Sequence, residues 1–212
     1  PSFFPTSQAK SCISASPTAL PLTLAKLSPA NPRDSVAAAC RARTNDALDG
    51  ALSKEQGRPG NGIVVGCSSI ATIKTDNDAA LLKCLDGKST IDVGQIKGPV
   101  LVNVWGSWCG PCKDEMPIFV DFYSKYKEKV SLIGISVEEA DVQNARDFIK
   151  LYGMSWPNLD DPDGSTRGTF GMGVPVTLFI DAQGGVVYKK IGVVTTIEEL
   201  ERDTQKYLGV QL

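Results

Sequence analysis

The tetrapeptide Cys109-Gly110-Pro111-Cys112 limits the possible folds most, because it stands between two segments of opposite character. Before it, residues 99–105 form a nearly continuous run of β-branched and apolar residues, which is typical of a strand covered on both faces of a sheet. After it, apolar residues between positions 116 and 123 recur at steps of three and four, which predicts a helix. The motif therefore marks the passage from a buried strand into a helix.

This position gives the two thiols different roles. A helix start presents unpaired N–H groups and the positive end of the helix dipole, which stabilise a thiolate at Cys109. Pro111 suits the first turn because the N–H that it lacks would have been unpaired there. Cys112 lies one turn further along and is expected to be the more buried thiol. We therefore expect Cys109 to attack a substrate disulfide and Cys112 to resolve the mixed disulfide.

The composition excludes several other classes of chemistry. The 212 residues include no histidine, so Ser-His-Asp and Cys-His nucleophiles and histidine metal sites are absent. A formal net charge of −2 argues against nucleic acid as the main partner, because phosphate binding needs a concentrated basic surface. The remaining four cysteines are spaced too widely to complete a Cys₄ zinc site. We expect neither a metal nor a cofactor.

The chain divides at a turn-rich stretch, residues 58–62. The first 62 residues hold 7 of the 13 prolines but only two of the 15 aromatic residues. We predict an N-terminal extension, residues 1–62, which is partly irregular with one helix over about residues 34–52, and a working domain, residues 63–212. No run of about 20 apolar residues exists, so we expect no part of the sequence to span a membrane. Because the sequence begins with Pro1 rather than Met, we expect that a signal or membrane anchor has been removed; a boundary without meaning for targeting is the alternative.

Further elements of the working domain follow from periodicity and turn residues. They are short strands at 63–65 and 71–73, a hairpin turn at Asp86-Gly87, a buried strand at 130–137, a helix capped by Asp141, a loop at 160–164, a hairpin of strands 176–180 and 186–191, and a last helix capped by Thr195 or Thr196. From residue 99 onward the order β-α-β-α-β-β-α predicts an α/β fold with a mixed sheet and helices on both sides.

The dithiol and its neighbours resemble the active site of thioredoxin-fold proteins. The stretch over residues 102–117, Val-Asn-Val-Trp-Gly-Ser-Trp-Cys-Gly-Pro-Cys-Lys-Asp-Glu-Met-Pro, is similar to the TlpA/ResA group of extracytoplasmic thiol-disulfide oxidoreductases. The resemblance covers residues from about 63 to 209 and does not include residues 1–62. It implies a thioredoxin-like fold, with a mixed central sheet flanked by helices. From the cysteine spacing we expect in addition that a disulfide ties the N-terminal extension.

The resemblance also implies a surface that binds substrate peptides. Val174-Pro175 resembles the cis-proline loop that faces the dithiol in this fold and offers backbone groups to a peptide. A trans proline at the start of a strand is the alternative. Trp108, together with Gly110 and Pro111 of the motif, is expected to complete the substrate-binding set.

Glu115 is the third candidate for the catalytic set, beside Cys109 and Cys112. It matches an acidic residue that the ResA-like branch carries near its dithiol, whereas Asn103 stands where cytoplasmic thioredoxins have a buried carboxylate. Three positions after Cys112 on a helix, Glu115 can tune thiol pKa values or transfer protons. A solvated glutamate on the helix surface is the alternative.

The four other cysteines allow three pairings. We favour the structural disulfides Cys12–Cys40 and Cys67–Cys84, because each links neighbours in sequence and leaves the dithiol free. The arrangement at Cys67 and Cys84 is also similar to that of actinobacterial-type TlpA-like proteins. An even number of widely spaced cysteines indicates an oxidising compartment.

The sequence therefore predicts a thiol-disulfide oxidoreductase outside the cytoplasm, membrane-anchored or secreted. Gly110-Pro111 is the thioredoxin-like choice and favours a reducing role. The resemblance implies disulfides of exported proteins such as apocytochrome c as substrates, and a membrane thiol-disulfide carrier as electron source. The alternatives are a disulfide oxidase or isomerase, a thiol peroxidase, whose Thr-x-x-Cys loop is missing before Cys109, and a non-enzymatic peptide-binding module with a groove at Pro175.

Overall fold

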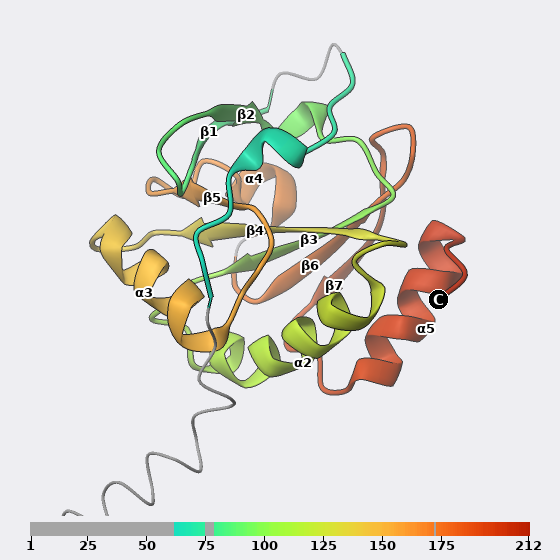
Figure 1. The fold of residues 1–212 in the computed structure, drawn as a ribbon. Coiled ribbons are helices and arrows are strands. Elements are labelled where there is room, and N and C mark those ends of the chain that lie inside the picture. Colours follow the sequence, from blue (N-terminus) through green and yellow to red (C-terminus); the bar gives the residue numbers. More distant parts are fainter. Residues whose placement is uncertain (1–61, 75–78, 172) are drawn as a thin grey trace, which may run out of the picture. The chain divides into compact units, whose positions relative to one another are not determined.

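The computed structural model describes residues 62–74, 79–171 and 173–212 (Figure 1). The helix expected over residues 34–52 and the Cys12–Cys40 disulfide lie outside the described residues. The division between residues 62 and 63 stays a prediction. Within the described ranges, none of the helices has the length and apolar character that crossing a bilayer requires.

A mixed sheet of seven strands forms the centre of the domain, in the order β2-β1-β5-β4-β3-β6-β7. The strands are β1 (Leu81–Cys84), β2 (Thr90–Asp92), β3 (Val100–Trp105), β4 (Ser131–Val137), β5 (Asn158–Asp161), β6 (Val176–Ile180) and β7 (Val186–Ile191). β3 runs parallel to β4 and antiparallel to β6, and all six of its residues are buried. The strand that leads into the dithiol is therefore a central, fully covered strand, as predicted.

Layers on both faces of the sheet bury two apolar cores. The helices are α2 (Gly110–Tyr126), α3 (Val142–Tyr152), α4 (Arg167–Phe170) and α5 (Ile197–Leu208), and the 3₁₀ turns are η1 (Cys67–Ser69) and η2 (Val93–Gln95). Residues of α2, α3 and α5 pack with Leu101 and Trp105 on one face. Residues of η1, η2 and α4 pack with Val102 and Val104 on the other, because successive side chains of a strand point to opposite faces. The predicted thioredoxin-like fold is confirmed.

Two local predictions are wrong. Residues 63–65 and 71–73 are not strands, and each contributes only an isolated bridge, Val65 to Pro157 and Thr72 to Ile96. Pro157 has no N–H, so a ladder beside Val65 cannot extend through it. The loop expected at 160–164 begins inside β5, whose polar residues have partners within the protein: Asp161, for example, accepts hydrogen bonds from Ser165 and Thr166.

The Cys67–Cys84 disulfide confirms the pairing favoured from the sequence. It joins η1 to β1 across a separation of 17 residues, with the two Cα atoms 5.9 Å apart. Both side chains are buried against the second face of the sheet. The bond therefore fastens the segment that leads into the domain to the sheet.

We expect the Cys67→Ala/Cys84→Ala double variant to lose about 3 kcal/mol of unfolding free energy, because the unfolded chain is no longer closed into a loop. Denaturant unfolding of the oxidised proteins, with the second disulfide intact in both, measures the difference. Equal stability of variant and wild type would contradict a structural role for this disulfide.

Candidate active site

The dithiol lies at the start of α2, directly after the central strand β3. Cys109 is the N-cap residue of the helix, and its Sγ accepts a hydrogen bond from the Cys112 N–H at 3.1 Å. Cys109 and Cys112 form a disulfide with their Cα atoms 5.3 Å apart. The sequence placed both thiols correctly at the strand-to-helix junction. The helix start and its N–H groups therefore face the sulfur of Cys109, where they stabilise a thiolate.

The two sulfurs differ in access, as predicted. The Cys109 side chain is 4% exposed and the Cys112 side chain is 0% exposed. Trp108, immediately before the motif, is 53% exposed and donates its indole N–H to the carbonyl of Val137 at 3.1 Å. An apolar surface thus lies beside the more accessible sulfur.

Glu139 holds the loop before the dithiol, a role that the sequence analysis missed. Its carboxylate accepts hydrogen bonds from both the backbone N–H and the hydroxyl of Ser107. Ser136, at the end of β4, donates its hydroxyl to the same carboxylate at 3.3 Å. The loop that carries Trp108 is therefore tied to the neighbouring parallel strand. Glu139 lies 32 residues from Ser107, and no local pattern links them.

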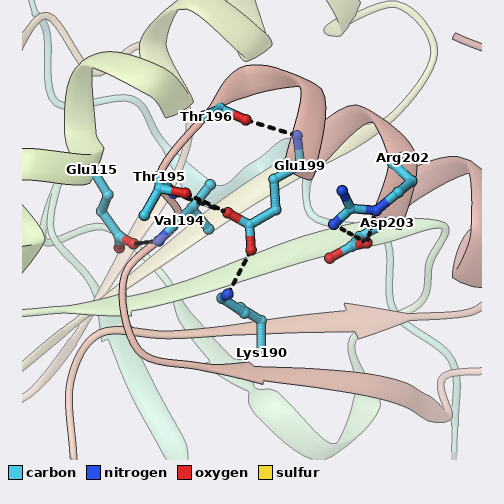
Figure 2. Close-up of polar contacts among 8 residues, drawn as sticks. All are labelled: Glu115, Lys190, Val194, Thr195, Thr196, Glu199, Arg202 and Asp203. Atoms are coloured by element: carbon cyan, nitrogen blue, oxygen red, sulfur yellow. Dashed lines mark hydrogen bonds and ion pairs between the residues drawn. The ribbon is translucent and has the colours of Figure 1, made fainter.

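Glu115 is buried, which rules out the alternative of a solvated helix-surface glutamate. Its side chain is 0% exposed. Oε1 accepts a hydrogen bond from the amide of Asn103 on β3 at 2.8 Å. Oε2 accepts one from the backbone N–H of Val194 at 2.9 Å (Figure 2). Three positions before it on the same helix stands Cys112, so the two side chains are neighbours on one face.

Burial raises the pKa of Glu115 from its usual value near 4.5 to about 7. The hydrogen bonds from Val194 and Asn103 stabilise the charged form and offset part of this effect. A carboxyl with such a pKa exchanges protons near neutral pH, as a histidine does in other enzymes. In a chain without histidine, Glu115 is suited to that task.

Asn103 can serve both protonation states of Glu115. Its Nδ2 donates to the carboxylate, and its Oδ1 has no hydrogen-bond partner among the described residues. Rotation of the amide by half a turn brings Oδ1 toward Glu115, where it accepts the proton of the carboxylic acid. The same partner therefore fits the acid and its anion.

The peptide-binding candidates lie on two parts of the chain, and two of them line a small pocket. The Val174–Pro175 bond is cis, as predicted, and so is Gly98–Pro99, which the sequence analysis did not single out. The pocket has a volume of about 80 Å³, and Trp108 and Val174 are among the residues that line it. Gly110 and Pro111, in the first turn of α2, lie next to Cys109. The expected substrate-binding residues thus come from two loops far apart in the sequence, and their contact with a substrate stays a prediction.

The comparisons with known proteins agree with this geometry. The AhpC/TSA family profile matches residues 76–189. The thiol-disulfide oxidoreductase ResA of Bacillus anthracis is 40% identical over 120 residues, which cover 55% of this chain and 68% of that protein. ResA of Bacillus subtilis strain 168 is 30% identical over 138 residues, which cover 64% of this chain and 75% of that protein.

The chain belongs to the ResA thiol-disulfide oxidoreductases of the AhpC/TSA family. Among solved structures, Mycobacterium tuberculosis DsbF covers 61% of this chain with a TM-score of 0.54 and 24% identity, and 96% of its own length is matched. The thio-disulfide isomerase of Thermus thermophilus covers 66% of this chain with a TM-score of 0.52 and 23% identity, over 100% of its own length. These two likenesses show the shared fold.

The buried Glu115 of this ResA-type protein makes its stability depend on pH. The folded protein holds the Glu115 proton up to a pH of about 7, whereas the unfolded chain releases it near 4.5, so stability falls as the pH rises between these values. We expect the unfolding free energy of the oxidised wild type, measured against Glu115→Gln, to fall by up to about 3 kcal/mol from pH 4.5 to pH 8. Denaturant unfolding at several pH values measures it. A difference that stays constant would contradict the raised pKa.

Proposed function

We propose that this protein reduces disulfides of exported proteins outside the cytoplasm, with Cys109 and Cys112 as the reacting thiols and Glu115 as the proton acceptor. The observation that carries the proposal is the buried Glu115 carboxyl one helical turn after Cys112, the less accessible sulfur. Belonging to the ResA thiol-disulfide oxidoreductases supports the reaction type.

The exchange has two steps. In the reduced protein the Cys109 thiolate attacks one sulfur of the substrate disulfide, whose S–S bond breaks, and the released substrate thiolate takes up a proton. Cys112 then loses its proton, and its thiolate attacks Sγ of Cys109 in the mixed disulfide. The Cys109–Cys112 bond forms, the bond to the substrate breaks, and the second substrate thiol leaves. Two electrons have passed from the dithiol to the substrate.

Glu115 takes part in the second step. Cys112 has no exposed surface, so water does not reach its thiol to accept the proton. The Glu115 carboxylate, next to it on α2, is the acceptor, and Asn103 turns its amide to hold the resulting acid. When the protein is reduced again, the same carboxylic acid returns the proton to the Cys112 thiolate.

The direction of electron flow is proposed from the residues between the cysteines. Gly110 and Pro111 are those of thioredoxin-like reductants, whereas strong oxidants stabilise their dithiol with other residues. A membrane thiol-disulfide carrier is the proposed source of the two electrons. Apocytochrome c is a candidate substrate because its haem-binding cysteines must be reduced before haem attachment.

The proposed location rests on the second disulfide. The Cys67–Cys84 disulfide is buried, and it links η1 to β1 rather than taking part in the dithiol site. Structural disulfides form and persist in oxidising compartments and are rare in the cytoplasm. A reductant that itself needs a structural disulfide suits a compartment outside the cytoplasmic membrane.

The roles of the two thiols are tested by trapping. We expect Cys112→Ser, expressed in its host, to hold substrates as mixed disulfides on Cys109, because no second thiol releases them. Mass spectrometry of the captured proteins identifies them, and exported proteins among them support the proposal. The matched control is Cys109→Ser, which is expected to capture at least tenfold less. Greater capture by Cys109→Ser would reverse the assignment of attacker and resolver.

The reducing role is tested by the potential of the dithiol. We expect a value near that of thioredoxin, about −270 mV, measured by equilibration with glutathione buffers or with a dithiol of known potential. The Cys67→Ala/Cys84→Ala variant is the control that assigns the measured potential to Cys109 and Cys112. A value near about −120 mV, which is typical of a strong oxidant, would overturn the reductase proposal.

A further inference from the structure

A polar row crosses the sheet beneath the buried carboxyl. Asn103 on β3 pairs in register with Thr177 on β6, and Thr177 pairs with Lys190 on β7. Residues in register on neighbouring strands share a face of the sheet, so these three side chains lie on the side that α2 and α5 cover. Asn103 and Thr177 are 0% exposed. Thr177 Oγ1, like Asn103 Oδ1, has no hydrogen-bond partner among the described residues, so packing alone does not account for polar residues here.

Lys190 ends this row in an ion pair with Glu199 of α5 (Figure 2). The two side chains are only 25% and 15% exposed, so solvent screens their charges less than it screens a surface pair. The hydrogen bond to Glu199 raises the pKa of Lys190. Burial raises the pKa of Glu199, but the hydrogen bonds from Lys190 and Thr195 outweigh it and leave this pKa below its usual value. Both groups are therefore charged near neutral pH.

Glu199 also fixes the loop that reaches Glu115. Its Oε2 accepts hydrogen bonds from the backbone N–H of Thr195 at 3.0 Å and from the Thr195 hydroxyl at 3.1 Å. Thr196 caps α5 by accepting the N–H of Glu199 at 3.1 Å. Val194 stands directly before Thr195 in this loop, and its N–H donates to Glu115 (Figure 2). The ion pair is thus connected to the buried carboxyl through a single anchored loop.

The charges of the pair act on Glu115 with opposite signs. Lys190, from β7, lowers the pKa of Glu115, and Glu199, from α5, raises it. On the remaining elements packed against Glu115, β3 contributes the neutral amide of Asn103, and α2 contributes the Cys112 thiol in the reduced protein. In the intact pair the two charges therefore oppose each other at Glu115.

We propose that the Lys190–Glu199 ion pair is a positioning element of the dithiol site, which holds Val194 against Glu115 and balances the charge that this carboxyl gains and loses during exchange. The inference rests on the proposed proton-accepting role of Glu115. Neither residue touches the reacting sulfurs, so both act through Glu115. Removing one charge leaves the other uncompensated, so the two single variants have opposite effects.

The test follows the Glu115 carboxyl by ¹³C NMR in the oxidised protein, where no thiol of the dithiol titrates, with Glu115→Gln assigning the resonance. We expect Lys190→Met to move the titration midpoint upward and Glu199→Gln to move it downward, each by about half a pH unit. Lys190→Arg and the double variant Lys190→Met/Glu199→Gln are expected to stay close to the wild type. Shifts in the same direction, or no shift in either single variant, would overturn the inference.

A matched control comes from the Lys125–Glu201 pair, which also links α2 to α5, at 2.8 Å, with side chains that are 57% and 22% exposed. Lys125→Met and Glu201→Gln are expected to leave the Glu115 midpoint unchanged. Midpoint shifts as large as those of the Lys190 and Glu199 variants would show a general effect of loosening α5, and would overturn the inference.

A second measurement separates this inference from the proposed function. The rate at which the reduced protein is oxidised by glutathione disulfide is measured between pH 5 and 9, by quenched alkylation. We expect the pH–rate profiles of Lys190→Met and Glu199→Gln to move with their NMR midpoints and that of Glu115→Gln to lose the step near pH 7. If Glu115→Gln leaves the profile unchanged, the proton-accepting role falls, whatever the NMR shows. If Glu115→Gln removes the step but the pair variants do not move it, only the present inference falls.

Discussion

The burial of one carboxyl, that of Glu115, ties together the parts of the protein that make the site. A carboxyl without exposed surface needs hydrogen-bond partners, because burying it without them costs several kcal/mol. Its two oxygens find these partners in Asn103 of the central strand and in Val194 of the loop before α5. The helix that carries the dithiol is thereby fixed against the sheet on one side and against the C-terminal part of the chain on the other. The protonation of Glu115 and the packing of this helix consequently depend on the whole fold.

The chain has no histidine, and burial gives Glu115 a pKa in the range that histidine covers in other proteins. Proton transfer near neutral pH needs a group whose pKa lies close to the ambient pH, and an exposed glutamate does not meet this condition. Burial brings the pKa of Glu115 to about 7. The free-energy cost of burying this carboxyl is limited by partners that accommodate both its charged and its neutral form. Asn103 does so through its two-sided amide, and the Lys190–Glu199 pair does so through opposite charges at a distance.

The sequence predicted those parts of the fold and site that depend on local patterns. β3, α2 and the two thiols between them follow from one apolar run, one helical period and the Cys-x-x-Cys spacing. β5 was missed because its residues are polar, and only the tertiary structure gives Asn158 and Asp161 their buried partners. Contacts such as Val194 with Glu115, 79 residues apart, and Glu139 with Ser107, 32 residues apart, leave no trace in local periodicity. Glu115 itself was found by resemblance, and its burial only by the structure.

The two disulfides described in this domain differ in their expected roles because their sulfurs lie in different surroundings. Cys67 and Cys84 lie within the second core, in η1 and β1, where they are 1% and 2% exposed. Cys109 lies at the N-terminus of a 17-residue helix, beside the exposed ring of Trp108. The Cys67–Cys84 bond is therefore suited to a structural role, whereas the Cys109–Cys112 bond, at a helix start and beside a buried carboxyl, is suited to exchange. The proposed exchange requires a rigid junction rather than a mobile one, because Cys109, Cys112 and Glu115 lie at the N-cap and within the first two turns of α2.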